Sequence, residues 1–220
     1  MDITWLGHAS VRVRSGQTSL VMDPFSDIIG LKIPPQMAQA NVVTISADDP
    51  EVSGTDALAE DPVPIVINGP GEYEAAGLRI KGIRTPRYAA EGVTVWNTSY
   101  VVELEGIVLC NLGNPGRLLS SREVEELASP HILIIPVGSK TGFSAADAVE
   151  MVNSISPKIV VPVLYAHHGN RADLRELAPF LSELGAKPTT EPQNRLTITR
   201  ANMPVEELQI SVLQPASVLI

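Results

Sequence analysis

The sequence predicts an α+β protein, a four-layer αββα sandwich in which two β-sheets pack face to face and helices cover their outer surfaces. The first half of the 220 residues consists of short runs rich in β-branched residues, separated by glycine-containing turns. The second half alternates amphipathic helical segments with apolar strands. Two sheets with helices outside would bury the apolar sides of both halves. A plain two-layer α/β fold fits the same periodicity nearly as well.

The first half opens as a meander of three strands with a turn at Gly7-His8. Short apolar runs of the kind found in buried strands follow it, and Gly69-Pro70-Gly71 marks a turn. We expect the strands of this half at Asp2–Leu6, Ser10–Arg14, Thr18–Asp23, Asn41–Ser46, Pro64–Asn68, Leu78–Ile83, Thr98–Leu104 and Ile107–Asn111.

The second half contains three segments with helical periodicity. Ser120 followed by Glu123 is typical of a capping box, and Ser144 followed by Asp147 is similar. The sequence therefore predicts helices beginning near Ser121, over Ser144–Ile155 and over Arg171–Leu184, the last ending at Gly185. Strands are expected at Ile132–Val137, Lys158–Val163, Thr197–Thr199 and Gln209–Leu213.

Chain length and composition predict one domain over residues 1–220, without a linker. The formal charge of −9 would repel nucleic-acid phosphates and anionic lipids, and no cluster of Lys and Arg offsets it. We therefore expect neither a nucleic-acid partner nor a membrane partner. No apolar run approaches the length of about 20 residues that a membrane helix needs.

The single cysteine, Cys110, lies in the apolar run Ile107–Leu112 and has no internal disulfide partner. A buried, reduced thiol of this kind is typical of a cytoplasmic protein. The first residues, Met1–Trp5, read directly as a strand and lack the basic and apolar regions of a signal peptide. Both features predict a cytoplasmic location.

Several motifs occur in a fixed order along the chain. Trp5-Leu6-Gly7-His8-Ala9-Ser10 is followed by a strand that ends in Asp23-Pro24-Phe25, and residues 67–74 read Ile-Asn-Gly-Pro-Gly-Glu-Tyr-Glu. Together they resemble the lactonase-like, Zn-dependent hydrolase-like branch of the metallo-β-lactamase superfamily, over nearly the whole chain. The resemblance implies the αββα fold of that superfamily. It also implies a hydrolase of esters, lactones or phosphoesters that uses bound metal to activate water.

The resemblance places most metal ligands in a His-x-His-x-Asp-His segment directly after the strand at Asn41–Ser46. Here the segment reads Ala47-Asp48-Asp49-Pro50-Glu51-Val52, so its three imidazoles are missing. The positions that the family uses for ligands are occupied by Ala47, Asp49, Glu51, Val52, Asn114 and Leu164. Methyl and isobutyl groups cannot coordinate a cation. We therefore expect a degenerate metal site with no metal cofactor, and Zn²⁺ least of all.

Three residues could replace missing ligands, namely Asp48, His167 and His168. The carboxylates of the loop after Ser46 would suit a weak Mg²⁺ or Mn²⁺ site, which is the alternative to a chain without metal. The simpler interpretation is a solvated acidic loop and a polar loop over Ala166–Asn170.

His8, Asp23 and Glu51 are the candidate catalytic residues. The resemblance suggests that His8 bonds the Asp23 carboxylate across neighbouring strands, as a buried structural pair. If that pair lined an open cleft, it could carry acid–base chemistry without metal. The loop Gly138–Gly142 lacks the spacing of a phosphate-binding loop, although its amides and Lys140 could hold an anion.

Three functions remain open from the sequence. The first is a non-hydrolytic pseudoenzyme, a scaffold that binds an unknown small molecule or protein. The second is a hydrolase of esters, lactones or phosphoesters with a remodelled carboxylate or metal-free site. The third is a structural role as a homo-oligomer, with the apolar segment Val212–Ile220 as a docking strand.

Overall fold

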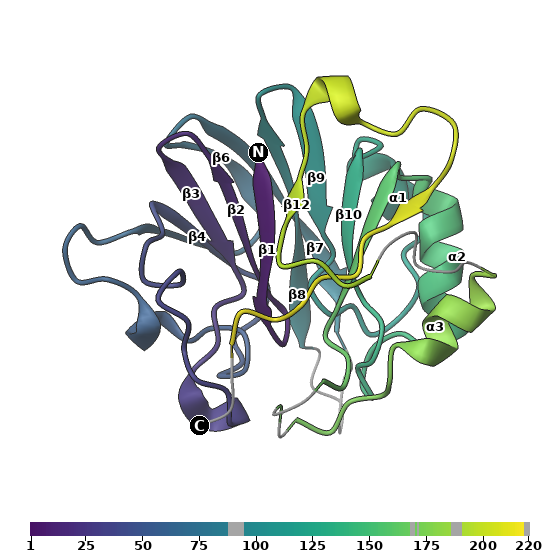
Figure 1. The fold of residues 1–220 in the computed structure, drawn as a ribbon, viewed down its shortest axis with the longest axis horizontal. Helices are drawn as coiled ribbons and strands as arrows, with labels where there is room; N and C mark the ends of the chain where they lie inside the picture. Colours follow the sequence, from purple (N-terminus) through teal and green to yellow (C-terminus); the bar gives the residue numbers. More distant parts are fainter. Residues whose placement is uncertain (88–94, 168–169, 171, 186–190, 218–220) are drawn as a thin grey trace.

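Two mixed β-sheets face each other in the computed structural model, which describes residues 1–87, 95–167, 170, 172–185 and 191–217 (Figure 1). The first sheet has six strands in the order β12-β1-β2-β3-β4-β5. Its strands are β1 (Asp2–Gly7), β2 (Ser10–Ser15), β3 (Thr18–Met22), β4 (Val42–Ile45), β5 (Ile65–Asn68) and β12 (Leu196–Thr197). The predicted sandwich of two sheets is confirmed.

The second sheet has seven strands in the order β13-β11-β10-β9-β8-β7-β6. Its strands are β6 (Gly71–Ala75), β7 (Leu78–Pro86), β8 (Trp96–Leu104), β9 (Ile107–Asn111), β10 (Ile132–Pro136), β11 (Ile159–Val163) and β13 (Gln209–Ile210). Strands β6 to β9 are antiparallel neighbours, whereas β9, β10, β11 and β13 run parallel. The change from antiparallel to parallel strands coincides with the point in the sequence where short turns between strands give way to helical connections.

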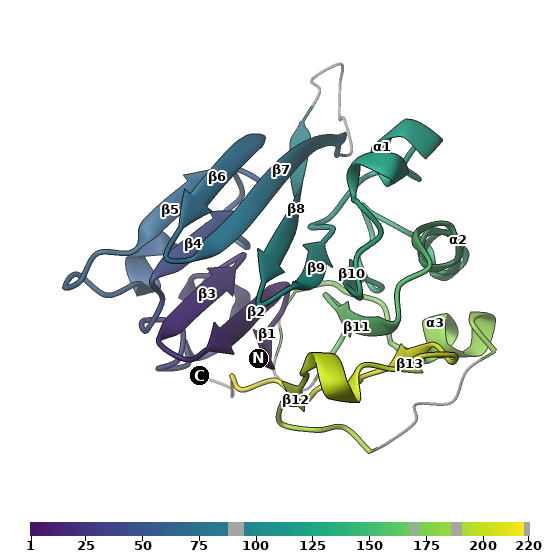
Figure 2. The same cartoon turned by 90° about the horizontal axis from the view of Figure 1, so that it is seen from above.

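Within the described ranges, the α-helices lie outside the second sheet (Figure 2). They are α1 (Ser121–Glu126), α2 (Ala145–Ile155) and α3 (Ala178–Glu183). The outer face of the first sheet is covered instead by the chain after β3, which includes the 3₁₀-helix η1 (Asp27–Ile29). Its side chains Phe25, Ile29, Leu31 and Met37 are buried against that sheet. The outer layer on this side is therefore largely irregular chain.

Successive side chains along the strands of the first sheet point to opposite faces and are buried in two separate cores. Leu20 and Met22 point into the core between the sheets, and Val21 points into the smaller core on the outer face. Val42 and Val43 divide in the same way. All four residues of β4 are buried, so the loop that follows β4 starts from a strand covered on both faces.

Two expected elements differ from the structure. The helix predicted over Arg171–Leu184 is present only at Ala178–Glu183 within the described residues 172–184, and Arg171 lies outside the described residues. Before it, the Arg175 N–H donates to the Gly138 carbonyl, and the Arg175 carbonyl accepts from Ala166 N–H, so this backbone joins neighbouring loops instead of a helix. The turn at Gly69-Pro70-Gly71 is followed by strand β6, which pairs with β7 and which we did not expect.

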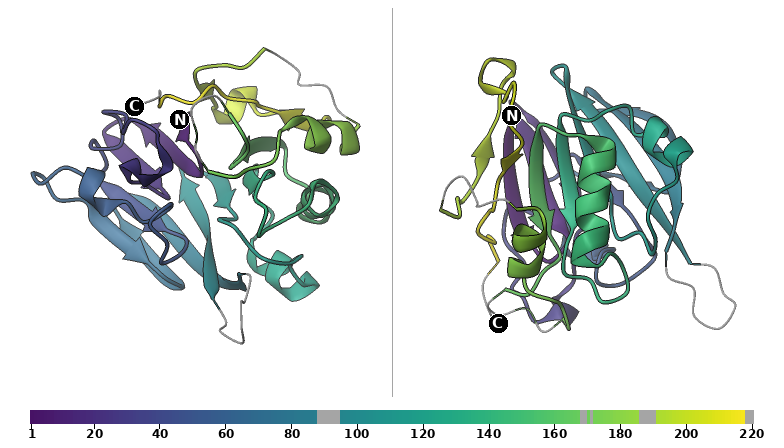
Figure 3. Two further views of the ribbon diagram at one scale, coloured as in Figure 1. Left: turned by 90° about the horizontal axis from the view of Figure 1, so that it is seen from below. Right: turned by 90° about the vertical axis from the view of Figure 1, so that its right-hand side faces the viewer.

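The C-terminal segment packs within the fold (Figure 3). Val212 and Leu213 are buried, and the Ala216 and Ser217 N–H groups donate to the Trp5 and Leu6 carbonyls. In the described part of the docking strand expected at Val212–Ile220, Val212, Leu213 and Ser217 are therefore already buried by their own chain, whereas Gln214 is exposed. The expected homo-oligomer stays a prediction. No described helix has the length and apolar character needed to cross a bilayer.

Replacing Ser144 by Ala tests whether α2 depends on its cap. The Ser144 hydroxyl accepts from the Asp147 N–H at 3.1 Å, and the Asp147 carboxylate accepts from the Ser144 N–H at 2.9 Å. Ser144→Ala should lower the free energy of unfolding by about 1 kcal/mol in urea denaturation. Ser154→Ala, at an exposed position of the same helix, is the control and should not destabilise. Equal effects of the two substitutions would contradict the role of the cap.

Candidate functional site

The candidate site lies where the carboxyl ends of several strands meet, along the lower edge of the molecule in Figure 1. The turn after β1 and the loops after β4, β9, β10 and β11 converge here, together with the end of β7. In open sheets with parallel strands, this edge is the usual place for ligands. The site is thus assembled from both sheets.

Three residues at this edge have a strained backbone. His8, Asp23 and Leu164 adopt positive φ angles of 53°, 51° and 54°, a region that L-residues seldom occupy. A hydrogen bond from Leu164 N–H to the His8 carbonyl, 3.0 Å long, joins the ends of the two sheets. Such conformations persist where the surrounding structure enforces them, which is frequent at functional sites.

A cavity of about 20 Å³ lies between these loops. That volume is enough for one water molecule. Polar side chains meet apolar ones at its wall, which is formed by His8, Ala9, Ser46, Ala47, Glu51, Val52, Arg87, Gly113, Asn114 and Leu164. Five of the six positions at which the family resemblance places metal ligands therefore surround one small space.

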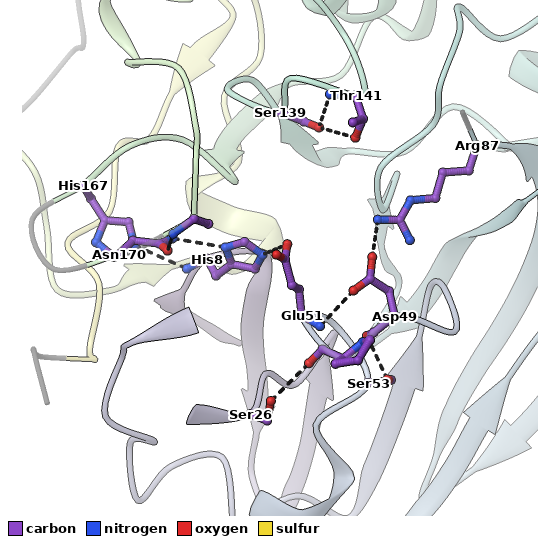
Figure 4. Close-up of polar contacts among 12 residues, drawn as sticks. His8, Ser26, Asp49, Glu51, Ser53, Arg87, Ser139, Thr141, His167 and Asn170 are labelled. Carbon is purple, nitrogen blue, oxygen red and sulfur yellow. Dashed lines mark hydrogen bonds and ion pairs between the residues drawn. The ribbon is translucent and has the colours of Figure 1, made fainter. Parts of the chain in front are cut away.

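His8 and Glu51 face each other across this cavity (Figure 4). The His8 Nε2 atom lies 3.3 Å from Glu51 Oε2, and the imidazole is 1% exposed whereas the carboxylate is 48% exposed. The contact lacks the alignment of a hydrogen bond, and Nε2 has no other hydrogen-bond partner among the described residues. The cavity therefore holds a buried ring nitrogen next to a carboxylate that solvent reaches.

The other side of His8 is held by neighbours. Its Nδ1 lies 3.1 Å from Asn170 Nδ2, and its backbone carbonyl accepts from Trp5 Nε1 at 2.9 Å. The His8 N–H donates to His167 Nε2 at 3.5 Å, and the His167 ring meets the Trp5 indole edge-on. These contacts set the position of the imidazole.

Asp49 and Arg87 form an ion pair beside the cavity. Arg87 Nη2 lies 2.6 Å from Asp49 Oδ2, and Asp49 Oδ1 accepts from the Glu51 N–H at 3.0 Å. Burial alone would raise the pKa of Asp49, but the Glu51 N–H and the Arg87 guanidinium together hold it below its ordinary value. Asp49 is therefore an anion that orients Arg87 and shapes the loop carrying Glu51.

Asp23 does not pair with His8, contrary to the expectation from the sequence. Its Oδ1 accepts from the Ser46 N–H at 2.7 Å and its Oδ2 accepts from Asn111 Nδ2 at 2.9 Å, while His8 bonds elsewhere. Asp23 lines neither cavity of the site. Burial raises its pKa to about 6 although both hydrogen bonds lower it. Asp23 is a structural residue behind the site.

Three apolar residues stand where the resemblance places ligands. Ala47, Val52 and Leu164 are all buried and form part of the cavity wall. Asn114 is 9% exposed; its N–H donates to Asn97 Oδ1, and its own Oδ1 packs closely against Gly142. These residues shape the cavity.

Of the three residues considered as replacement ligands, Asp48 and His167 do not line the cavity. Asp48 is exposed and is absent from its wall. His167 lies behind His8 against Trp5, as described above, and His168 lies outside the described residues. Across the described ranges, no three side chains of His, Cys, Asp or Glu gather as cation ligands would.

A larger groove of about 280 Å³ adjoins the small cavity and shares Glu51, Arg87, Asn114 and Leu164 with it. Its wall is completed by Ser139, Lys140, Thr141, Ala172, Asp173 and Leu174. Lys140 pairs with Asp173. The groove offers room for a substrate whose reacting group would lie at the small cavity.

A still larger groove, of about 460 Å³, lies beside α1 on strands β6 to β8 and is lined in part by Tyr73, Ile80 and Val101. It contains no histidine, and the one residue with a positive φ in its wall is Ala128. We place the site at the smaller cavity, because loops from both sheets meet there and five of the six positions indicated by the family resemblance line it.

Sequence reasoning missed two residues of the site, Arg87 and Asn170. Arg87 directly follows strand β7, which ends at Pro86, and that position was the available signal. Asn170 belongs to a loop that returns to the site from the other end of the chain, and its contact with His8 spans 162 positions. No local pattern indicates such a contact.

Comparisons with known proteins agree with this fold. A family model described as a beta-lactamase superfamily domain matches residues 2–164. A UPF0173 metal-dependent hydrolase from Archaeoglobus fulgidus is 22% identical over 193 residues, which cover 75% of this chain and 83% of the relative.

Solved structures are similar over most of the chain. A candidate Zn-dependent hydrolase of the metallo-beta-lactamase superfamily from Thermotoga maritima superposes with a TM-score of 0.71 and 27% identity, covering 96% of this chain and 97% of that one. An isothiocyanate hydrolase from Delia radicum gut bacteria gives a TM-score of 0.65 at 12% identity, with coverage of 90% and 99%, and supports the fold alone.

These findings overturn two expectations from the sequence. The relatives are metal-dependent hydrolases by name, so the interpretation as a non-hydrolytic pseudoenzyme or binding scaffold is wrong. The expectation that no metal cofactor is needed, and Zn²⁺ least of all, is wrong for the same reason, because one similar structure is a candidate Zn-dependent hydrolase. The error lay in deriving loss of function from the loss of particular ligands.

Asp23 should make stability depend on pH. Its pKa is raised from 3.8 to about 6 in the fold, so folding favours its protonated form. The stabilisation from Asp23 is complete below about pH 4 and is lost as the pH rises past about 6. The difference in unfolding free energy between wild type and Asp23→Asn should therefore fall over this range, as measured by denaturation at each pH. Asp27→Asn, at an exposed carboxylate, is the control. A difference that stays flat or rises would contradict the buried, proton-binding state.

Proposed function

The chain belongs to the beta-lactamase superfamily, and from this membership we propose that it is a hydrolase of esters, lactones or phosphoesters. The names of its relatives, metal-dependent hydrolases, support the reaction type. One observation carries the proposal in this chain: the Glu51 carboxylate and His8 Nε2 lie 3.3 Å apart at a cavity of about 20 Å³ beside a larger groove.

The superfamily implies a bound metal, which would supply an activated water and polarise the substrate oxygen. The described residues do not reproduce such a ligand set, because no three His, Cys, Asp or Glu side chains converge among them. The side chains of Ala47, Val52 and Leu164 in the cavity wall have no atom that could bind a cation. We therefore assign every step below to side chains of this chain.

Glu51 is the proposed general base. Its half-exposed carboxylate lines both the small cavity and the groove, so it reaches a water molecule next to a bound substrate. It takes a proton from that water as the oxygen bonds to the carbonyl carbon or phosphorus. When the intermediate collapses, the bond to the leaving oxygen breaks and that oxygen takes the proton from Glu51. Atoms and charge are thus balanced over one turnover.

Arg87 is the proposed stabiliser of negative charge. Asp49 holds one of its terminal nitrogens at 2.6 Å, and the side chain lines both the cavity and the groove. A guanidinium carries five N–H donors in a planar fork, so donors remain for a substrate oxygen. Donors that are fixed before the reaction stabilise a developing oxyanion at little reorganisation cost.

Two parts of the proposal concern the whole chain. We assign it a single domain over residues 1–220 and a cytoplasmic location, where lone thiols stay reduced. Cys110 is fully buried, and burial raises the pKa of its thiol, which keeps it unreactive.

Glu51→Gln should abolish most of the hydrolysis, because the amide cannot accept the water proton. The expected loss in kcat is about 10²- to 10⁴-fold with activated ester, lactone and phosphodiester substrates. The assay includes a series with Zn²⁺ or Mn²⁺ added, since the relatives are metal-dependent hydrolases. Asp48→Asn is the matched control, as it removes an exposed carboxylate from the same loop. The same rate in both variants would count against Glu51 as base.

Arg87→Lys should separate catalysis from stability. Lysine keeps the positive charge next to Asp49 but loses the planar fork that can bind two groups at once. We expect kcat to fall about 10²-fold with little change in unfolding free energy. Arg84→Lys is the control, because Arg84 lies over the exposed Trp96 ring and lines neither cavity. An unchanged kcat in Arg87→Lys would rule out the oxyanion role.

A further inference from the structure

We infer that Asn170 holds His8 in the tautomer with its proton on Nε2, and so makes His8 the hydrogen-bond donor of the hydrolytic site. The inference rests on the proposed function for its catalytic meaning. Its structural content stands on contacts of Asn170, His8 and Glu51 alone.

A hydrogen bond fixes the orientation of the Asn170 amide. Its Oδ1 accepts a hydrogen bond from the Ala172 N–H at 2.8 Å. Exchanging the two amide atoms would place N–H against N–H, so this bond fixes which atom points where. The Nδ2 group consequently faces His8 Nδ1, at 3.1 Å.

The Asn170 amide in turn decides which nitrogen of the His8 ring carries the proton. An amide nitrogen can only donate, so Nδ1 has to accept and carries no proton. A neutral imidazole with a bare Nδ1 has its proton on Nε2. The groups that act on the ring from its other side are Glu51, Asp49 and Arg87.

The Nε2 proton points toward the small cavity. Nε2 belongs to a residue that is 1% exposed and lines the small cavity, and no described residue hydrogen-bonds to it. A buried N–H without a partner costs about 1–3 kcal/mol. An oxygen of a substrate at the cavity would remove that cost. The site therefore favours ligands that present an acceptor oxygen beside Glu51.

The backbone around His8 keeps the ring in this place. His8 has a φ of 53°, its carbonyl accepts from Trp5 Nε1 and Leu164 N–H, and its N–H donates to His167. The Nδ1 edge of the ring thus lies against Asn170, and the Nε2 edge lies at the cavity. A division of roles follows, with Glu51 as the proton acceptor and neutral His8 as the donor to the oxyanion, as neutral imidazoles serve in other enzymes.

Nitrogen-15 NMR of the full chain at neutral pH tests the tautomer directly. The His8 ring should show an unprotonated Nδ1 and a protonated Nε2. The sequence has four histidines, so the His8 signals are assigned by their loss in His8→Gln. A proton on Nδ1, or a mixture of tautomers, in the wild type would overturn the inference without any variant or assay.

Asn170→Asp tests whether Asn170 sets the tautomer. Its carboxylate still accepts from Ala172 N–H but now requires a donor at His8 Nδ1, so that nitrogen should become protonated. Asn153→Asp makes the same charge change at an exposed position of α2 and should leave the His8 signals unchanged. An unchanged His8 spectrum in Asn170→Asp would refute the role of Asn170. Added Zn²⁺ that replaces the Nε2 proton in the wild type would refute the donor role.

Kinetics test the consequence for catalysis. His8→Ala should lower kcat about 10²-fold, and His8→Gln, whose amide can still donate, should retain activity to within about tenfold of the wild type. Equal losses in the two variants would defeat the donor role. If the wild type hydrolyses none of the substrates, the proposed function fails while the NMR result on the tautomer still stands, so the two failures are distinguishable.

Discussion

One buried carboxylate holds the site together. Asp23 follows β3, and its two oxygens accept hydrogen bonds from the first residue after β4, Ser46, and from the last residue of β9, Asn111. Ser46 follows a strand of the first sheet, and Asn111 ends a strand of the second sheet. The loop that carries Asp49 and Glu51 therefore starts at a point fixed relative to the second sheet. The Asp23 carboxylate has to be buried to make both hydrogen bonds, and this burial raises its pKa.

The fold was predictable because its elements are locally encoded. Short runs of strand-forming residues separated by turns marked β2 and β3, and the capping boxes at Ser120 and Ser144 are present as expected. The errors arose where distant chain decided the structure. Arg175 bonds with Gly138 and Ala166 instead of extending α3, and β6 forms because β7 is beside it. Tertiary hydrogen bonds of this kind leave no trace in local periodicity.

The site was predictable only in part. The resemblance located the loop after β4, and Glu51, Asn114 and Leu164 do surround one cavity. The pairing of His8 was not predictable, because its partners Glu51 and Asn170 are 43 and 162 positions away in the sequence. The two expectations that failed, a non-hydrolytic scaffold and no metal cofactor, came from counting lost imidazoles. That count describes one ligand set and leaves the reaction type undecided.

The arrangement of charge explains how chemistry can remain at a cavity lined by Ala47, Val52 and Leu164. Each cation at the groove has an anionic partner, Asp49 for Arg87 and Asp173 for Lys140. Glu51 faces His8 Nε2 at 3.3 Å, and no described Lys or Arg pairs with its carboxylate. The carboxylate is 48% exposed and lines the groove, so a water molecule beside a substrate can give it a proton. Loss of imidazoles and retention of hydrolysis are therefore physically compatible in this chain.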